Sequence, residues 1–123
     1  MEKQEILNKE VGNIEPERTM LAPAKVKIVS VDIEDTAKAK KVVFECKHPN
    51  KEETIKISSV SRIVEKQIKA TGTWLNLDKE EKLQKGSALA DFLKFLDIKT
   101  LSEAVNKEVV TELDGNYLCF KGY

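Results

Sequence analysis

The stretch from Thr73 to Leu96 reads TWLNLDKEEKLQKGSALADFLKFL, and it decides the fold class because it places one clear helix between two groups of strand-like segments. Ser87 is a typical N-cap residue, whose hydroxyl accepts a hydrogen bond from an unpaired backbone N–H of the first turn. Apolar residues follow at helical spacing, at positions 89, 92, 93 and 96. We therefore predict a helix over 87–96 that buries this stripe.

A long strand is expected near the start of the chain, over residues 25–34. Its apolar phase changes midway, from even positions (26 and 28) to odd positions (29, 31 and 33). A bulge would explain the change in a long, bent strand, and the alternative is a strand buried on both sides. A bent first strand is typical of a small barrel.

Three further segments lie between this strand and the helix. Residues 41–48 and 54–59 alternate in polarity on either side of a turn at 48–51, which predicts a hairpin. Residues 59–65 fit helical spacing, and we interpret them as a short helical turn. Residues 67–77 are rich in Thr, Trp and Leu and predict another strand.

The residues after the helix predict a short second helix at 100–105 and a C-terminal hairpin. Asp114-Gly115 joins the alternating segments 107–113 and 116–121, and this dipeptide is a strong signal for a tight hairpin turn. Strands and helices do not alternate, so a parallel sheet is not expected. The order predicts an α+β, mainly β fold: an antiparallel, partly open OB-like barrel of five to six strands, with one main helix before the C-terminal hairpin.

Length and composition fit one domain preceded by a leader. Gly12, Pro16 and Pro23 interrupt any long helix at the start of the 123-residue chain. We interpret residues 1–23 as an N-terminal leader, either mobile or docked on the body, and residues 24–123 as a single globular domain. The formal net charge of zero does not indicate a globally basic nucleic-acid binder, but residues 24–70 carry a net charge of +4. The ordinary explanation of such lysines is a set of solvated outward strand faces.

No catalytic or metal motif stands out in the sequence. His48, the only histidine, precedes Pro49 in a turn, so we expect it to be exposed and without partners for Ser-His-Asp or Cys-His chemistry. The acidic groups at 32–35 and 78–81 lack the ligand spacing of a calcium loop. We expect no enzyme activity, no cofactor and no metal.

The two cysteines, Cys46 and Cys119, lie 73 positions apart, which is not a metal-ligand spacing. Two buried free thiols in a reducing cytoplasm are the expected state, and a single disulfide is the alternative. The first residues lack the apolar region of a signal peptide, and no apolar run is long enough to cross a membrane. The sequence therefore predicts a cytoplasmic protein that does not enter a membrane.

A candidate nucleic-acid site centres on Trp74, the only tryptophan. If Leu75 and Leu77 face the core, Trp74 points outward and can stack on a nucleobase. The alternative is that Gly72 shifts the phase and Trp74 packs under the helix. Basic side chains of the neighbouring strands would contact phosphates. The residues expected to form this site are Trp74, Lys47, Lys56, Arg62 and Lys69.

A candidate anion site lies at the start of the predicted helix. Backbone N–H groups at a helix N-terminus attract phosphate, and nearby lysines strengthen the attraction. The alternative is an ordinary capped helix with solvated lysines. The residues of this candidate site are Lys82, Lys85, Gly86 and Ser87.

The segment WLNLDKEEKLQKGSALADFL, with LAPAKVKIV before it and DGNYLCFKGY at the end, resembles small uncharacterised proteins of archaea, bacteria and their viruses. The order of elements over residues 24–121 also resembles that of OB-like single-strand-binding accessory proteins, without a shared diagnostic residue motif. The second resemblance implies a nucleic-acid role, although one fold hosts many functions.

Two functions are therefore expected. The first is a non-enzymatic binding module that contacts single-stranded DNA or RNA through its basic strands and Trp74. The second is a protein-interaction or assembly module, with a protein partner or a homodimer pairing at the edge of the C-terminal strand. In this second hypothesis Tyr117, Phe120 and Tyr123 lie along the docking edge.

Overall fold

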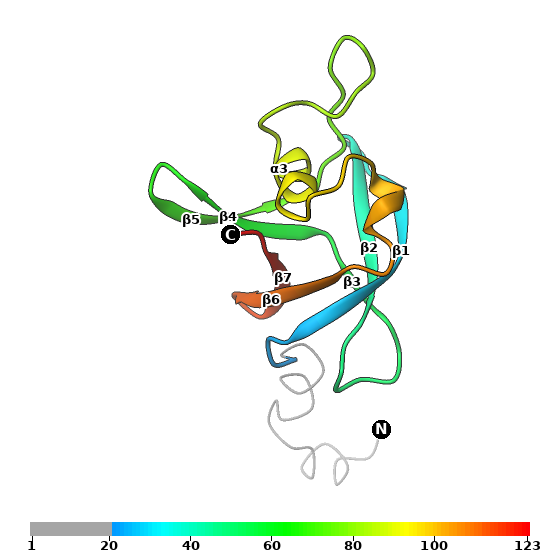
Figure 1. Cartoon of the computed structure of the whole chain (residues 1–123), viewed down its shortest axis with the longest axis vertical. Coiled ribbons are helices and arrows are strands. Elements are labelled where there is room, and N and C mark those ends of the chain that lie inside the picture. The colour runs from blue at the N-terminus through cyan, green and yellow to red at the C-terminus, as the bar shows by residue number, and fades with distance from the viewer. Residues whose placement is uncertain (1–20) are drawn as a thin grey trace, which may run out of the picture.

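A computed structural model describes residues 21–123, so the predicted leader falls outside the described residues as far as position 20. Over the described part, one α-helix and one short 3₁₀-helix accompany seven strands (Figure 1). The strands are β1 (Lys25–Asp35), β2 (Lys40–Lys47), β3 (Ile55–Ile57), β4 (Ser59–Val64), β5 (Gln67–Gly72), β6 (Glu108–Asp114) and β7 (Tyr117–Lys121). The helices are α3 (Ala88–Phe95) and the 3₁₀-helix η1 (Leu101–Ala104), which lie close to the predicted ranges.

The strands of residues 21–123 form one mixed sheet in the order β3-β2-β1-β6-β7-β4-β5. Strands β4 and β7 pair in parallel, and the other neighbours pair antiparallel. The predicted α+β, mainly β class is confirmed. The expectation of a wholly antiparallel sheet of five to six strands is wrong, because the chain crosses over between β4 and β7 by way of β5, α3 and β6.

Strand β1 contains the irregularity that its sequence indicated. Its register against β2 shifts between Ile28 and Ser30, so that Ile28 pairs with Cys46 while Val31 pairs with Phe44. Three residues on β1 therefore span two on β2, and one extra residue is accommodated. The bulge keeps Ile28 and Val31 on the face that carries the core residues of β2.

Residues 59–64 form strand β4 and not the predicted helical turn. Val60 pairs with Phe120 of β7, and the rest of β4 forms a hairpin with β5 that projects from the body (Figure 1). Glu65 and Lys66 make its two-residue turn with positive φ angles of 53° and 68°. Type I′ turns need such angles and favour Asn-Gly, so this turn carries no sequence signature.

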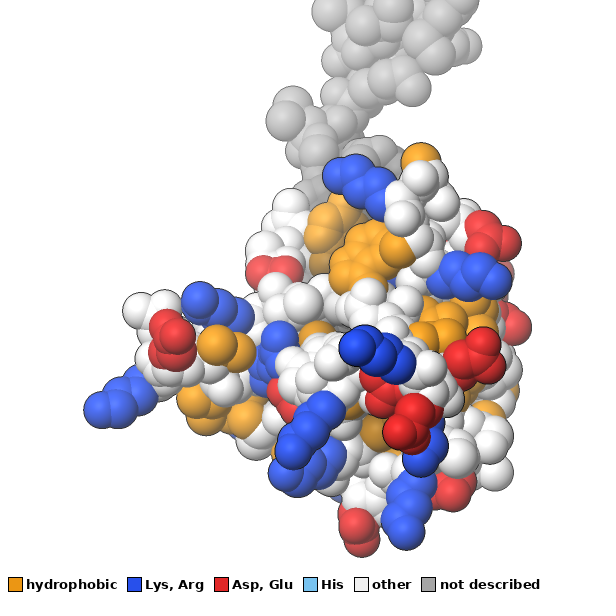
Figure 2. All heavy atoms as spheres, turned by 90° about the horizontal axis from the view of Figure 1, so that it is seen from above, with side chains coloured by type: hydrophobic (Ala, Val, Ile, Leu, Met, Phe, Trp, Pro, Cys, Tyr) orange, Lys and Arg blue, Asp and Glu red, His pale blue; other side chains and the backbone are white. Residues whose placement is uncertain are grey.

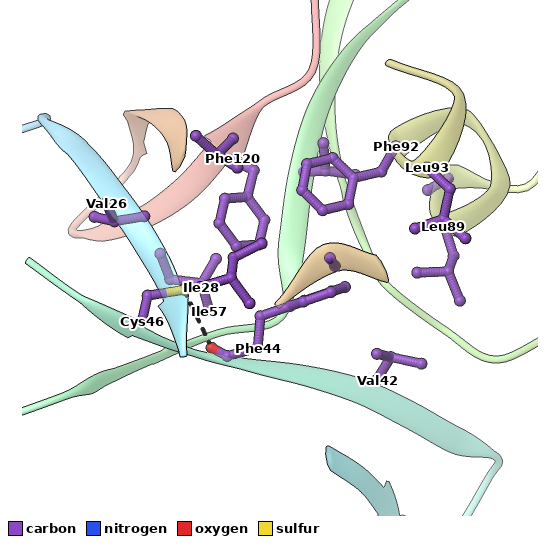
Figure 3. Packing of buried hydrophobic residues seen from close by; sticks show 14 of the residues in the cluster. Val26, Ile28, Val42, Phe44, Cys46, Ile57, Leu89, Phe92, Leu93 and Phe120 are labelled. Atoms are coloured by element: carbon purple, nitrogen blue, oxygen red, sulfur yellow. Dashed lines mark hydrogen bonds between the residues drawn. The ribbon is translucent and has the colours of Figure 1, made fainter. Parts of the chain in front are cut away.

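The core gathers three phenylalanines from β2, α3 and β7 (Figure 3). The rings of Phe92 and Phe120 are stacked with centroids 4.7 Å apart, and Phe44 meets both edge-on at 5.5 and 5.3 Å. Such arrangements add roughly 0.5–1.5 kcal/mol per pair beyond burial. Helix α3 contributes the predicted stripe, in which Leu89, Phe92 and Leu93 are buried.

His48 is fully buried, and the expectation that it would be exposed is wrong. Its Nε2 lies 2.8 Å from the carbonyl oxygen of Ala22, and its Nδ1 accepts a hydrogen bond from the backbone N–H of Asn50. These partners place the proton on Nε2, which donates to the Ala22 oxygen. The imidazole therefore joins the start of the described chain to the β2–β3 turn, 26 positions away.

The C-terminal hairpin and the free thiols agree with the sequence. Asp114 pairs with Tyr117 across a two-residue loop, in which Gly115 has a φ of 64°. Cys46 and Cys119 are both free and buried.

Candidate nucleic-acid interface

An open groove runs between β3 and the first half of β7, where the sheet ends. Strand β3 is the last strand on its side of the sheet, and in residues 21–123 no backbone hydrogen bond joins β3 to β7. This β3–β7 groove has a volume of about 430 Å³. Residues that line it include Lys41, Lys51, Ile55, Lys56, Tyr117 and Leu118.

The β3–β7 groove combines cationic side chains with an exposed aromatic ring. Lys41, Lys51 and Lys56 line it together with one carboxylate, that of Asp114. Tyr117 is the first residue of β7, directly after the β6–β7 turn, and 72% of its surface is exposed. Ammonium groups bind phosphate, and a free aromatic face stacks on a base, so the groove offers both contacts that a single nucleic-acid strand needs.

Trp74 lies half-buried beside the β3–β7 groove, on the outer face of the sheet. It forms an isolated β-bridge with Lys41, flanked by a hydrogen bond from the Val42 N–H to the Thr73 carbonyl and another from the Leu75 N–H to the Lys40 carbonyl. Because Val42 belongs to the core, its neighbour Lys41 points outward, and Trp74 opposite shares that face. Trp74 is not among the residues that form or border the core, which favours the outward orientation over packing under the helix.

The Lys41 ammonium covers the indole of Trp74. Lys41 Nζ lies 5.0 Å from the ring centroid, which is a cation–π distance. Gly72 permits this arrangement, because a Cβ at that position would lie 2.8 Å from Trp74 Nε1 and 3.3 Å from Lys41 Cε.

The other basic residues of the predicted site are dispersed. Lys56 lines the β3–β7 groove and lies 3.7 Å from the Glu34 carboxylate. The Lys47 ammonium donates to backbone carbonyls of Lys51 and Glu52 and so organises the β2–β3 turn. Lys41 and Lys56 both line the groove, and Lys41 covers Trp74, so Trp74 and Lys56 lie in the same region. Lys47 instead stabilises the β2–β3 turn.

Arg62 and Lys69 lie opposite each other in the β4–β5 hairpin, away from the β3–β7 groove. Arg62 Nη1 donates to the Gly86 carbonyl and to the Asp91 carboxylate, so that β4 is tied to the start of α3. This pairing gives Arg62 a structural role, while Lys69 remains exposed on the hairpin.

At the candidate anion site at the start of α3, groups of the chain itself interact with the helix N-terminus. Ser87 Oγ accepts a hydrogen bond from the Ala90 N–H at 3.1 Å, and Asp91 places a carboxylate in the first turn. The Lys82 ammonium lies 3.4 Å from the Glu80 carboxylate, and Lys85 is exposed. These contacts describe a capped helix, and anion binding there stays a prediction.

A larger cavity of about 640 Å³ lies between α3 and the loop that precedes it. Its walls are apolar, with Leu93 and Ile98 as buried members, and its rim carries Glu81 and Asp97 beside lysines. Seen from the α3 end, basic and acidic side chains are interspersed over the molecule (Figure 2). No single charge dominates this end, so it is the weaker candidate for a polyanion.

The cysteine thiols are unsuited to nucleophilic chemistry. Burial, with a further contribution from the Glu45 carboxylate, raises the pKa of the Cys46 thiol to about 12. Burial also raises the pKa of Cys119, whose Sγ lies 3.0 Å from Ser61 Oγ. Thiolates are the reactive form, so both groups behave as packing residues near neutral pH.

Residues 21–123 contain neither a metal-binding cluster nor a membrane-spanning helix. Within residues 21–123, no three His, Cys, Asp or Glu side chains gather closely enough to hold a metal ion. In that range, no helix has both the length and the apolar character needed to cross a bilayer.

Lys41, Lys51 and Tyr117 line the groove but were not among the five residues predicted to form the site. Lys41 and Lys51 belong to the basic central segment, and Tyr117 was assigned to an edge for a protein partner. Their proximity depends on β7 returning beside β3, which no local pattern encodes.

A comparison with protein-family models, curated proteins and solved structures gives no significant match to the chain.

Proposed function

We propose that this chain is a non-enzymatic binding module whose β3–β7 groove holds single-stranded DNA or RNA. The observation that carries the proposal is the exposed ring of Tyr117 in a groove with three lysines. Base stacking on an aromatic ring contributes about 1–3 kcal/mol and tolerates any base. Recognition would therefore depend on single-stranded form more than on sequence.

We further propose that the sheet curls into a partly open OB-like barrel, and the topology supports this proposal. Strand β1 pairs with both β2 and β6, and α3 lies between β5 and β6 in the chain. The Thr73 N–H donates to the Ser58 carbonyl and its carbonyl accepts from Val42, so that one residue links β2 to the β3–β4 junction. In OB-folds, oligonucleotides bind over strands 2 and 3 and the loop between the last two strands. In this proposal the β3–β7 groove, which includes residues next to the β6–β7 turn, corresponds to that surface.

Fluorescence anisotropy of a labelled oligothymidylate tests the proposal. Neutralising three phosphates of a single strand gives a salt slope of about −2, so affinity should fall about twentyfold between roughly 50 and 200 mM salt. Tyr117→Ala should weaken binding about tenfold, since it removes one stacked base. Phe95→Ala removes an exposed aromatic ring from α3, off the groove, and serves as the matched control. Equal affinities for these two variants, or binding that salt leaves unchanged, would refute the nucleic-acid function.

A protein-interaction function is the second candidate, in a modified form. Strand β7 lies between β6 and β4, so the C-terminal strand is not the sheet edge that the sequence analysis expected. Its first half nevertheless borders the β3–β7 groove, where two backbone edges are not paired with each other. An extended peptide could add there as a strand. Light scattering that shows a stable dimer, combined with no oligonucleotide binding, would favour this function.

A further inference from the structure

Lys41 takes part in two structural features at once. Its side chain lines the β3–β7 groove together with Lys56 and Tyr117. Its ammonium also lies 5.0 Å from the centroid of the Trp74 indole. Lys41 therefore borders the groove while its ammonium lies over the second aromatic ring of this region.

The backbone around Lys41 and Trp74 fixes this arrangement. The two residues form a β-bridge, and hydrogen bonds of 2.9 and 2.8 Å hold the adjoining Val42–Thr73 and Leu75–Lys40 backbone pairs. The absence of a side chain at Gly72 lets the indole settle against the strand. The backbone pairing holds the two residues opposite each other, and the Lys41 side chain is the long, flexible part of the pair.

Lys41 differs from the other lysines of the region in its partners. Lys56 lies within salt-bridge distance of Glu34, and the Lys47 ammonium donates to two backbone carbonyls. Within residues 21–123, no carboxylate lies within 4.0 Å of the Lys41 ammonium. Its recorded contact there is the indole face, which a phosphate can outcompete because a charge-assisted hydrogen bond is the stronger interaction.

We propose that Lys41 is a switch residue that couples phosphate binding in the β3–β7 groove to the opening of the Trp74 indole. A phosphate in the groove draws the ammonium away from the ring, and the uncovered ring then stacks on a neighbouring base. This inference rests on the proposed nucleic-acid function and adds a second stacking surface to it. It also explains why the tryptophan lies beside a groove that it does not line.

Acrylamide quenching of tryptophan fluorescence tests the switch, because Trp74 is the only tryptophan. Two strands are compared, an oligothymidylate and an abasic oligodeoxyribose phosphate of equal length, with anisotropy recording binding in each case. The abasic strand supplies phosphates without bases, so quenching of Trp74 should rise above that of the free protein. The oligothymidylate should lower quenching below that of the free protein, because a base covers the ring.

Lys41→Met keeps an unbranched side chain over the indole and removes the charge. In this variant the abasic strand should leave quenching unchanged, and the salt slope for oligothymidylate should shrink by about 0.7. Lys99→Met, on the loop after α3, is the control and should behave as the wild type.

The possible failures separate the switch from the function on which it rests. Anisotropy that shows binding, with quenching unaltered by the abasic strand in the wild type, overturns the switch and leaves the nucleic-acid function standing. An abasic response in Lys41→Met equal to that of the wild type also overturns it. If neither the oligothymidylate nor the abasic strand binds, both the nucleic-acid function and the switch are overturned.

Discussion

At the residue scale, small side chains decide how the Lys41–Trp74 pair is placed. Gly72 has an ordinary backbone conformation, so alanine is tolerated by the main chain there, but its Cβ would lie 2.8 Å from Trp74 Nε1. Gly72→Ala should therefore displace the indole and shift its emission while changing the free energy of unfolding by less than about 1 kcal/mol. Thr71→Ala, one position earlier on β5, is the control. Identical emission spectra for the two variants would contradict this packing.

A second prediction at this scale concerns the Cys46 thiol. Its pKa is raised from its ordinary value of 9.0 to about 12, mainly by burial, so the folded chain holds the proton more tightly than the unfolded chain does. The resulting stabilisation is complete below about pH 9 and is lost as the pH rises toward 12. At about pH 10 the loss should be about 1.4 kcal/mol.

Urea unfolding of the wild type and of Cys46→Ala, at about pH 8 and pH 10, measures this contribution. Other groups titrate in both proteins, so the informative quantity is the difference between their pH dependences. Cys46→Ala is less stable because it leaves a cavity, but it should lose less stability on going to alkaline pH. Equal losses in the two proteins would exclude Cys46 as the source.

At the scale of elements, the β4–β5 hairpin closes through a turn that its residues disfavour. Glu65 and Lys66 adopt positive φ angles of 53° and 68°, although left-handed backbone costs a non-glycine residue about 1–2 kcal/mol. Glu65→Asn combined with Lys66→Gly should raise the free energy of unfolding by about 1 kcal/mol, measured by urea unfolding. Gly115→Ala, at a φ of 64° in the β6–β7 turn, should lower it by a similar amount. A destabilised Asn-Gly variant would show that the turn residues make stabilising contacts.

The same two turns show which elements the sequence could predict. The β6–β7 hairpin was predictable because Gly115 supplies the positive φ of its turn, although the two-residue loop is Gly115-Asn116, one position after the predicted Asp114-Gly115. The β4–β5 hairpin was not, because Glu65-Lys66 resembles a solvated helix segment and Val60 and Ile63 suit helical spacing equally well. The α3 helix was predictable from its Ser87 cap and apolar stripe. The phase change in β1 correctly indicated a bulge.

The candidate site was only partly predictable, for reasons of sequence distance. Period-two alternation left an outward Trp74 and a Trp74 packed under the helix as alternatives, whereas the charge map located the basic segment. The burial of His48 depends on Ala22, and the β3–β7 groove depends on Tyr117 returning beside Lys56. Contacts of this range follow from topology, which one sequence without a family match leaves open.

At the scale of the whole molecule, Thr73 connects the parts of the sheet that border the binding region. Its hydroxyl donates to the Val42 carbonyl at 2.6 Å, while its backbone N–H donates to the Ser58 carbonyl and its carbonyl accepts from the Val42 N–H. The side chain is fully buried, so removal of the hydroxyl leaves a buried acceptor without this partner. Thr73→Val keeps the shape of the side chain, which makes it a clean test of that bond.

Thr73→Val should lower the free energy of unfolding by about 1–3 kcal/mol. It should also speed hydrogen exchange of the Val42 amide, because β2 loses part of its attachment to the segment that carries Trp74. Thr73→Ser is the matched control, since it retains the hydroxyl and should keep the slower exchange despite a lost methyl group. If loss of the Thr73–Val42 hydrogen bond is what loosens the binding region, oligothymidylate affinity should fall in Thr73→Val and not in Thr73→Ser. The reverse pattern, with Thr73→Ser impaired and Thr73→Val unaffected, would mean that burial of the methyl group, and not the hydrogen bond, holds the binding region to the sheet.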